Sequence, residues 1–269
     1  MPVSRAVYTH GHHESVIRSH AWRTAANSAA YLLPHLRSGM SLLDVGCGPG
    51  TITADLAALV APGPVTAIDT AEGIVAQAKE TVAAQSLANV TCEVGDVYDL
   101  AYPERSFDVV HAHQMLQHVA DPVGALAAMR AACKPGGVVA ARDTDYATFT
   151  WYPEVPALAE WLELYHRLAR ANGGEPDAGR RLLSWARSAG FTDVTATASV
   201  WCFATPDDRA WWSGLWADRV TGSTIADQAI AYGFATRADL ERIADGWREW
   251  GTADDGWFSV LHGEIICRA

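Results

Sequence analysis

The chain has 269 residues, of which 49% are hydrophobic and 19% charged, so it can bury a large core and global disorder is excluded. Its net charge of −11 disfavours nucleic acid and anionic membrane surfaces as partners. The five cysteines are scattered and form no CxxC pair, and no segment is typical of a signal peptide or a membrane span, which predicts a cytoplasmic protein with reduced thiols.

Helical spacing predicts a helix over residues 15–37, within an N-terminal helical cap of residues 1–38. From residue 39 to residue 146, short apolar strands alternate with helices. This alternation predicts a doubly wound α/β fold with a mostly parallel sheet covered on both faces. The strands are expected at 41–46, 65–69, 90–96, 107–113 and 138–143, and the helices at 51–60, 71–85 and 121–133, with the turn KPGG before the fifth strand.

The regular alternation stops after residue 146. Residues 147–190 are expected to form a helical lid insertion, and residues 191–269 to complete the sheet with a further helical insertion. The elements expected here are two helices around the loop 170–179, a strand at 193–203, helices within 206–250 and a closing strand at 257–267.

Tryptophan is concentrated in this second half, since only Trp22 of the 11 tryptophans precedes residue 150. A group of aromatic side chains there predicts an apolar pocket for a flat or aromatic substrate. The alternative for each of them is ordinary helix packing. The candidates are Trp151, Tyr152, Trp211, Trp212 and Trp216.

Residues 42–51, LLDVGCGPGT, join a buried strand to a turn that contains Gly46, Gly48 and Gly50. In doubly wound sheets, ligands bind outside the carboxyl ends of the strands, and a glycine-rich turn lets them approach the backbone. The alternative is a tight turn without a ligand. The spacing is GxGxG rather than the dinucleotide pattern GxGxxG, which favours S-adenosylmethionine over a nicotinamide dinucleotide.

Acidic residues follow the next two strands. Asp69 can accept hydrogen bonds from both hydroxyls of a ribose, and Asp96 can accept one from an adenine amino group, with Val97 against the ring. The alternatives are a helix N-cap for Asp69 and a turn residue for Asp96. Cys47 is expected to pack rather than to act as a nucleophile.

The ordered motifs LLDVGCGPGTIT, VTAID, VGDV, FDVVHAHQMLQHVADP and KPGGVV resemble those of class I S-adenosylmethionine-dependent methyltransferases. Within that family they are most similar to the group that contains the ubiquinone and menaquinone C-methyltransferases and many small-molecule enzymes. The resemblance spans residues 40–142 and implies a seven-stranded sheet with an antiparallel last strand. It implies cofactor contacts from Tyr8, Asp44, Gly46, Gly48, Gly50, Asp69, Thr70, Asp96 and Val97, and from the backbone of His113.

Methyl transfer from a sulfonium needs an aligned nucleophile, and a phenol, enol or amine acceptor must also lose a proton. Histidine suits proton transfer because its pKa is about 6.5. The candidates are His118 and His13, and the alternative for His118 is packing against the next helix. No metal is expected, since His10, His12 and His13 have irregular spacing.

The sequence therefore predicts methyl transfer from S-adenosylmethionine to a small, apolar or aromatic molecule. Two alternatives stay open: an S-adenosylmethionine-binding protein with a non-methylating or regulatory role, and a nicotinamide-dependent oxidoreductase. Arg180 and Arg181 are expected to solvate a helix end rather than to anchor an acidic group. The segment 1–20 leaves a homodimer open, through exchange between subunits.

Overall fold

The computed structural model describes residues 7–9 and 14–269, with backbone alone at 14–17. Its first half alternates strands and helices at positions close to the predicted ones. These elements are β1 (Leu42–Val45), α3 (Thr51–Val60), β2 (Val65–Asp69), α4 (Glu72–Ala84), β3 (Val90–Val94), β4 (Phe107–His113), η2 (Leu116–His118), α5 (Pro122–Ala132) and β5 (Cys133–Thr144).

The second half contains the expected lid helices and both expected strands. In the described part of the chain, no helix has the length and apolar character needed to cross a membrane. The elements are η3 (Tyr146–Thr148), β6 (Thr150–Tyr152), α6 (Pro156–Ala171), η4 (Gly179–Arg181), α7 (Leu182–Ser188), β7 (Val194–Phe203), α8 (Pro206–Gly222), α9 (Thr224–Ala231), α10 (Arg237–Gly251) and β8 (Trp257–Arg268).

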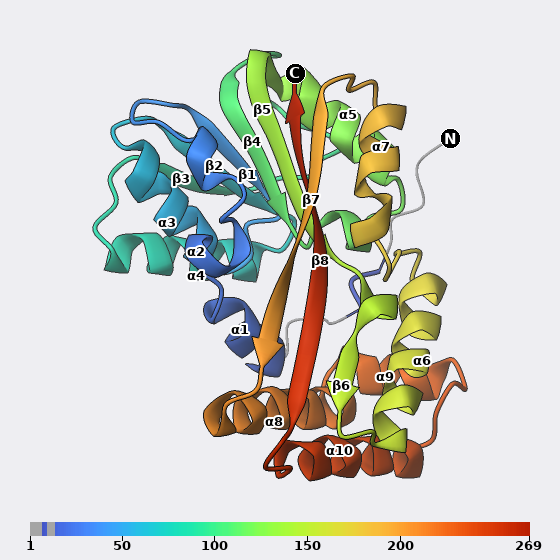
Figure 1. Ribbon diagram of the computed structural model, residues 1–269. Helices are drawn as coiled ribbons and strands as arrows, with labels where there is room; N and C mark the ends of the chain where they lie inside the picture. Colours follow the sequence, from blue (N-terminus) through green and yellow to red (C-terminus); the bar gives the residue numbers. More distant parts are fainter. Residues whose placement is uncertain (1–6, 10–13) are drawn as a thin grey trace.

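The strands of the described residues form one eight-stranded sheet (Figure 1). Its order is β3-β2-β1-β4-β5-β8, and β6 and β7 both pair with β8. Strands β1 to β5 are parallel, whereas β8 runs antiparallel to its three partners. This arrangement confirms the predicted α/β fold. The expected number of seven strands was one too low, because β8 extends beyond β5 and pairs there with the short β6.

Helices cover both faces of the parallel strands (Figure 1). Helices α3 and α4 contact β1, β2 and β3 on one face, while α5 and α7 contact β4, β5 and β7 on the other. Each face has its own apolar core. Because the helices cover the faces of the sheet, a ligand-binding site is expected at the loops that follow the carboxyl ends of the strands. The domain boundaries at residues 38, 146 and 190 stay predictions.

The single helix predicted over residues 15–37 is wrong. The segment forms three short pieces, α1 (Glu14–Ala21), α2 (Ala25–Ser28) and η1 (Leu33–His35). The break after α1 has a clear local cause, because Thr24 begins a new helix through reciprocal side-chain and backbone hydrogen bonds with Asn27. The breaks let α1 contact α8 while α2 contacts α3.

The turn KPGG predicted before the fifth strand lies inside β5. Phe107 pairs with Cys133, but Val109 already pairs with Val138, so two steps along β4 correspond to five along β5. The intervening residues of β5 bulge out of register, and Gly136 has a φ of +77°.

The tryptophans of the second half form an apolar core between α6, α8, α10 and the far end of β8, rather than an open pocket. Trp161, Trp216, Trp247 and Trp250 are at most 1% exposed. Of the predicted pocket residues, Tyr152 is 56% exposed and Trp151 packs against this core. The alternative of helix packing therefore accounts for most of them.

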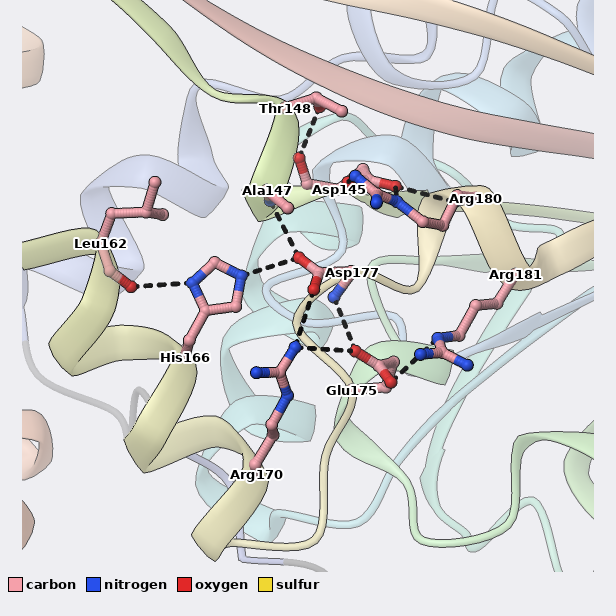
Figure 2. Close-up of polar contacts among 10 residues, drawn as sticks. All are labelled: Asp145, Ala147, Thr148, Leu162, His166, Arg170, Glu175, Asp177, Arg180 and Arg181. Atoms are coloured by element: carbon pink, nitrogen blue, oxygen red, sulfur yellow. Dashed lines mark hydrogen bonds and ion pairs between the residues drawn. The ribbon is translucent and has the colours of Figure 1, made fainter. Parts of the chain in front are cut away.

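A network of charged side chains fastens the loop between α6 and α7 (Figure 2). Asp177 accepts hydrogen bonds from His166 and Arg170, which lower the pKa of its carboxyl although burial opposes them. Arg180 binds both oxygens of the buried Asp145, at 2.6 Å each. Arg181 pairs with Glu175. Both arginines thus anchor carboxylates of the chain and hold the loop in place, so the prediction that they solvate a helix end rather than anchor an acidic group is wrong.

Candidate active site

A cavity of about 680 Å³ lies at the carboxyl ends of β1, β2 and β4. Gly50 is not among the residues that line it, and His13, with His10 and His12, falls outside the described residues. In the described part of the chain no group of three or more metal-binding side chains is found. The predicted residues that line the cavity are Tyr8, Asp44, Gly46, Gly48, Asp69, Thr70, Asp96, Val97, His113 and His118.

The glycine turn has a backbone that other residues rarely adopt. Gly46, Gly48 and Gly50 all have positive φ angles, of +72°, +55° and +82°. A Cβ on Gly46 would lie 2.8 Å from the side chain of Met115, so the turn leaves no room for one. A Cβ on Gly50 would lie 3.0 Å from Ala78, which shows that Gly50 permits the close approach of α3 to α4.

Asp44 is buried beneath the turn. One carboxylate oxygen accepts a hydrogen bond from Thr53 at 2.5 Å, and the other lies 2.8 Å from Nδ1 of His111. These contacts connect β1 to α3 and β4, so Asp44 braces the site from below while also lining the cavity.

Asp69 and Asp96 are held by backbone N–H groups and still line the cavity. Asp69 accepts hydrogen bonds from Gly48 at 3.2 Å and Ala71 at 3.1 Å, and Asp96 accepts one from Tyr98 at 3.0 Å. A carboxylate has about four acceptor positions, so each keeps capacity for a ligand. The N-cap of α4 is Ala71 and not Asp69, and the turn contacts of both acids are compatible with a ligand role.

Tyr8 and His118 both line the cavity and contact each other edge to face, with ring centroids 4.8 Å apart. Burial raises the pKa of Tyr8 to about 12, against the charges of Arg23 and Arg219. Burial, with Arg23 nearby, lowers the pKa of His118 to about 3. Both side chains are therefore neutral near pH 7, and proton uptake by His118 is disfavoured.

His113 is 6% exposed at the end of β4. Neither ring nitrogen has a hydrogen-bond partner among the described residues. Burial, Arg23 and Arg142 hold the pKa of His113 well below its usual range. His113 lines the cavity, which agrees with the backbone contact that the sequence predicts.

Arg23 is the main site residue that the sequence analysis missed. It lies in the break between α1 and α2 and lines the cavity together with His20 of α1. Its Nε is buried without a hydrogen-bond partner among the described residues, and burial lowers the pKa of the guanidinium to about 10, so it remains charged. Nothing in its sequence context distinguishes it, because an arginine inside the predicted helix 15–37 usually faces solvent.

Comparison with known proteins decides the family. Residues 36–190 match the family model of a methyltransferase domain. The chain belongs to the class I S-adenosylmethionine-dependent methyltransferases. An uncharacterized methyltransferase of Schizosaccharomyces pombe is 32% identical to this methyltransferase over 98% of the chain and 97% of its own length.

Two further similarities agree with this assignment. A demethylmenaquinone methyltransferase of Staphylococcus aureus is 37% identical over 46% of the methyltransferase and 51% of its own length. Among solved structures, phosphoethanolamine N-methyltransferase 2 of Haemonchus contortus, in complex with phosphomonomethylethanolamine and S-adenosylhomocysteine, shares the fold with a TM-score of 0.55. It is 20% identical and covers 86% of this chain and 49% of its own. The cofactor of the methyltransferase is S-adenosylmethionine.

Asp143 makes the stability of the enzyme depend on pH. It is fully buried behind η2, where one oxygen accepts the N–H of Gln117 at 3.0 Å and the other has no partner among the described residues. Burial raises its pKa from 3.8 to about 7. Because the folded state holds this proton more tightly than the unfolded state, stability is full below pH 4 and falls as the pH rises to 7.

Asp143→Asn is therefore expected to gain stability relative to the natural protein between pH 4 and pH 7. The gain in melting temperature should reach about 5 °C. For a chain of this size, each kcal/mol of unfolding free energy shifts the melting temperature by about 2–4 °C. Thermal unfolding at a series of pH values measures it, with the exposed Asp193→Asn as control. A difference between variant and natural protein that stays constant with pH would contradict the assignment.

Proposed function

We propose that the enzyme transfers the methyl group of S-adenosylmethionine to a small, apolar or aromatic acceptor by in-line substitution. One observation supports this most: the glycine turn and the acids after β2 and β3 converge on a single cavity of about 680 Å³. This volume is typical of a pocket for small ligands.

The cavity residues fit the parts of the cofactor. Asp69 is proposed to bind the ribose hydroxyls, while Asp96 and Val97 contact the adenine. Gly46 and Gly48 leave room beside the methionine part, with Thr70 and the backbone of His113 as further contacts and Tyr8 covering the site. The charged guanidinium of Arg23, which lines the cavity, suits a carboxylate, and the methionine part carries one.

When bound, S-adenosylmethionine supplies an electrophilic methyl carbon on a positively charged sulfur. The protein contributes mainly alignment and exclusion of water. His118 has a pKa too low for efficient proton uptake in this state, so we propose that it orients the acceptor as a neutral imidazole. An acidic acceptor would then react as its anion, which nearby cationic groups stabilise. A basic role for His13 stays a prediction.

The finer predictions on location and partners belong to the same proposal. We propose a cytoplasmic enzyme, which is supported by the five cysteines being free in this fold. The net charge of −11 supports small molecules rather than nucleic acid as substrates. A homodimer stays a prediction.

Calorimetric titration and product analysis test the function. The enzyme is expected to bind S-adenosylmethionine and S-adenosylhomocysteine with micromolar affinity, and NAD much more weakly. Incubation with S-adenosylmethionine and a panel of aromatic acceptors should release S-adenosylhomocysteine, detected by mass spectrometry. Cofactor binding without any such product across the panel would favour the non-methylating alternative, and binding of NAD alone would contradict the proposal.

A further inference from the structure

Gln117 of η2 directly precedes His118, which lines the cofactor cavity. Gln117 itself is 3% exposed and does not line the cavity. Both ends of its side-chain amide are engaged: the oxygen faces Thr144 at the end of β5, and the nitrogen faces His118. A buried amide held at both ends can determine which atom it presents to a neighbour.

Thr144 fixes the orientation of this amide. Its backbone N–H and its hydroxyl donate hydrogen bonds to Oε1 of Gln117, at 3.3 and 2.8 Å. A backbone N–H can only donate, so the atom that faces it has to be the amide oxygen. An amide turned the other way would set two N–H donors against each other. Nε2 of Gln117 is therefore the atom that faces His118.

The orientation of the amide in turn fixes where His118 carries its hydrogen. Nε2 of Gln117 lies 2.9 Å from Nε2 of His118. An amide nitrogen donates and does not accept, so the imidazole nitrogen opposite it has to accept and carries no hydrogen. The hydrogen of the neutral ring is then on Nδ1. A charged ring would place a second donor in this contact, which agrees with the low pKa that burial and Arg23 give His118.

The backbone of Gln117 is held independently of the cavity. Its N–H donates to the buried Asp143 at 3.0 Å, and its carbonyl accepts the N–H of Glu175 at 2.9 Å. A Cβ on Gly174 would lie 2.7 Å from the same carbonyl, so the loop between α6 and α7 packs closely here. The ion pairs that fasten this loop include Glu175 with Arg181 (Figure 2). Gln117 is therefore held between β5 and a fastened loop.

We propose that Gln117 is a positioning residue that holds His118 as the neutral imidazole with its hydrogen on Nδ1, so that Nε2 does not serve as a base for the methyl acceptor. The inference rests on the proposed function and deepens it, because it narrows the class of acceptor. Suitable acceptors are acidic phenols or enols that bind as anions, and amines that bind uncharged. In neither case does a proton have to reach His118 before the bond to the methyl carbon forms.

NMR of the histidine ring nitrogens tests the position of the hydrogen directly. The enzyme carries isotope-labelled histidine and is saturated with S-adenosylhomocysteine, and His118→Asn assigns the signals of His118 by their loss. A ring nitrogen with a hydrogen and one without differ in chemical shift, so the two neutral forms are distinguishable. At pH 7 the natural protein is expected to show a neutral His118 with its hydrogen on Nδ1.

Gln117→Met keeps a side chain of similar length but removes the amide donor. The ratio of the two neutral forms of His118 should then shift about fivefold toward hydrogen on Nε2, because one hydrogen bond to the ring is lost. Gln228→Met is the matched control. Gln228 is a partly buried amide of α9 that accepts a hydrogen bond from Asn172 at 2.8 Å and does not line the cavity. Its loss should leave the signals of His118 unchanged.

The outcomes separate the two proposals. Failure of S-adenosylhomocysteine to bind would contradict the proposed function, while the hydrogen of His118 could still be located in the unbound enzyme. Normal binding, with a charged His118 or with the hydrogen on Nε2 in the natural protein, would overturn the inference alone. Equal signals of His118 in Gln117→Met and Gln228→Met would also overturn it, because Gln117 would then not determine the form of the ring.

Discussion

Asp69→Ala is expected to weaken binding of S-adenosylhomocysteine about 100-fold. The variant removes a carboxylate that lines the cavity and is proposed to accept hydrogen bonds from two ribose hydroxyls, each contributing about 1.5–3 kcal/mol. Calorimetric titration of the variant and the natural protein measures the change. Asp69→Asn keeps one acceptor oxygen and should lose about tenfold.

The fold must be preserved for this result to report on the cofactor. Asp69 also accepts the N–H groups of Gly48 and Ala71, so the variant could shift the glycine turn. Glu72→Ala is the matched control, since Glu72 is an exposed carboxylate in the first turn of α4 that does not line the cavity. Unchanged affinity in Asp69→Ala, with a normal unfolding curve, would contradict the ribose assignment.

Glu264→Ala is expected to destabilise the enzyme by about 3–5 kcal/mol, because it leaves the charge of Arg142 buried without a partner. Nε of Arg142 lies 3.2 Å from Glu264, and these side chains are 1% and 6% exposed. Ser199 and Thr197 donate hydrogen bonds to the same carboxylate at 2.5 and 2.9 Å. Burial lowers the pKa of Arg142 to about 10, so it is still charged at pH 7.

Urea unfolding at pH 7 measures the loss. Glu160→Ala removes the carboxylate of an ion pair with Arg242 in which both side chains are about half exposed, and it should change stability little. A loss in Glu264→Ala no larger than in Glu160→Ala would show that the buried pair contributes nothing specific.

The parallel half of the fold could be predicted because each element has a local signal. Strands β2 and β4 and helix α3 begin and end at the predicted residues, since apolar runs bounded by glycine, proline and acids define them. The bulge in β5 and the short strand β6 could not be predicted. Both depend on the register against partners that lie far away in the sequence.

The residues of the candidate site also fall into two groups, those that the sequence predicts and those that it does not. Asp69, Asp96 and the glycine turn could be found because strand ends in a doubly wound sheet meet at one edge. Arg23 could not, since its place at the cavity arises from burial, which is a property of the packed structure. The lowered pKa of His118 has the same origin, and its suitability as a base could not be judged from its place in the chain.

Strand β8 has a consequence for how the enzyme is made. It lies between β5 and β7 in the sheet, yet it comprises residues 257–268 and so is synthesised after both of them. Until it is in place, β5 and β7 both present unpaired backbone along their edges, and the tryptophan core lacks Phe258. Such edges template aggregation, so a chain interrupted before Trp257 should be recovered in the insoluble fraction.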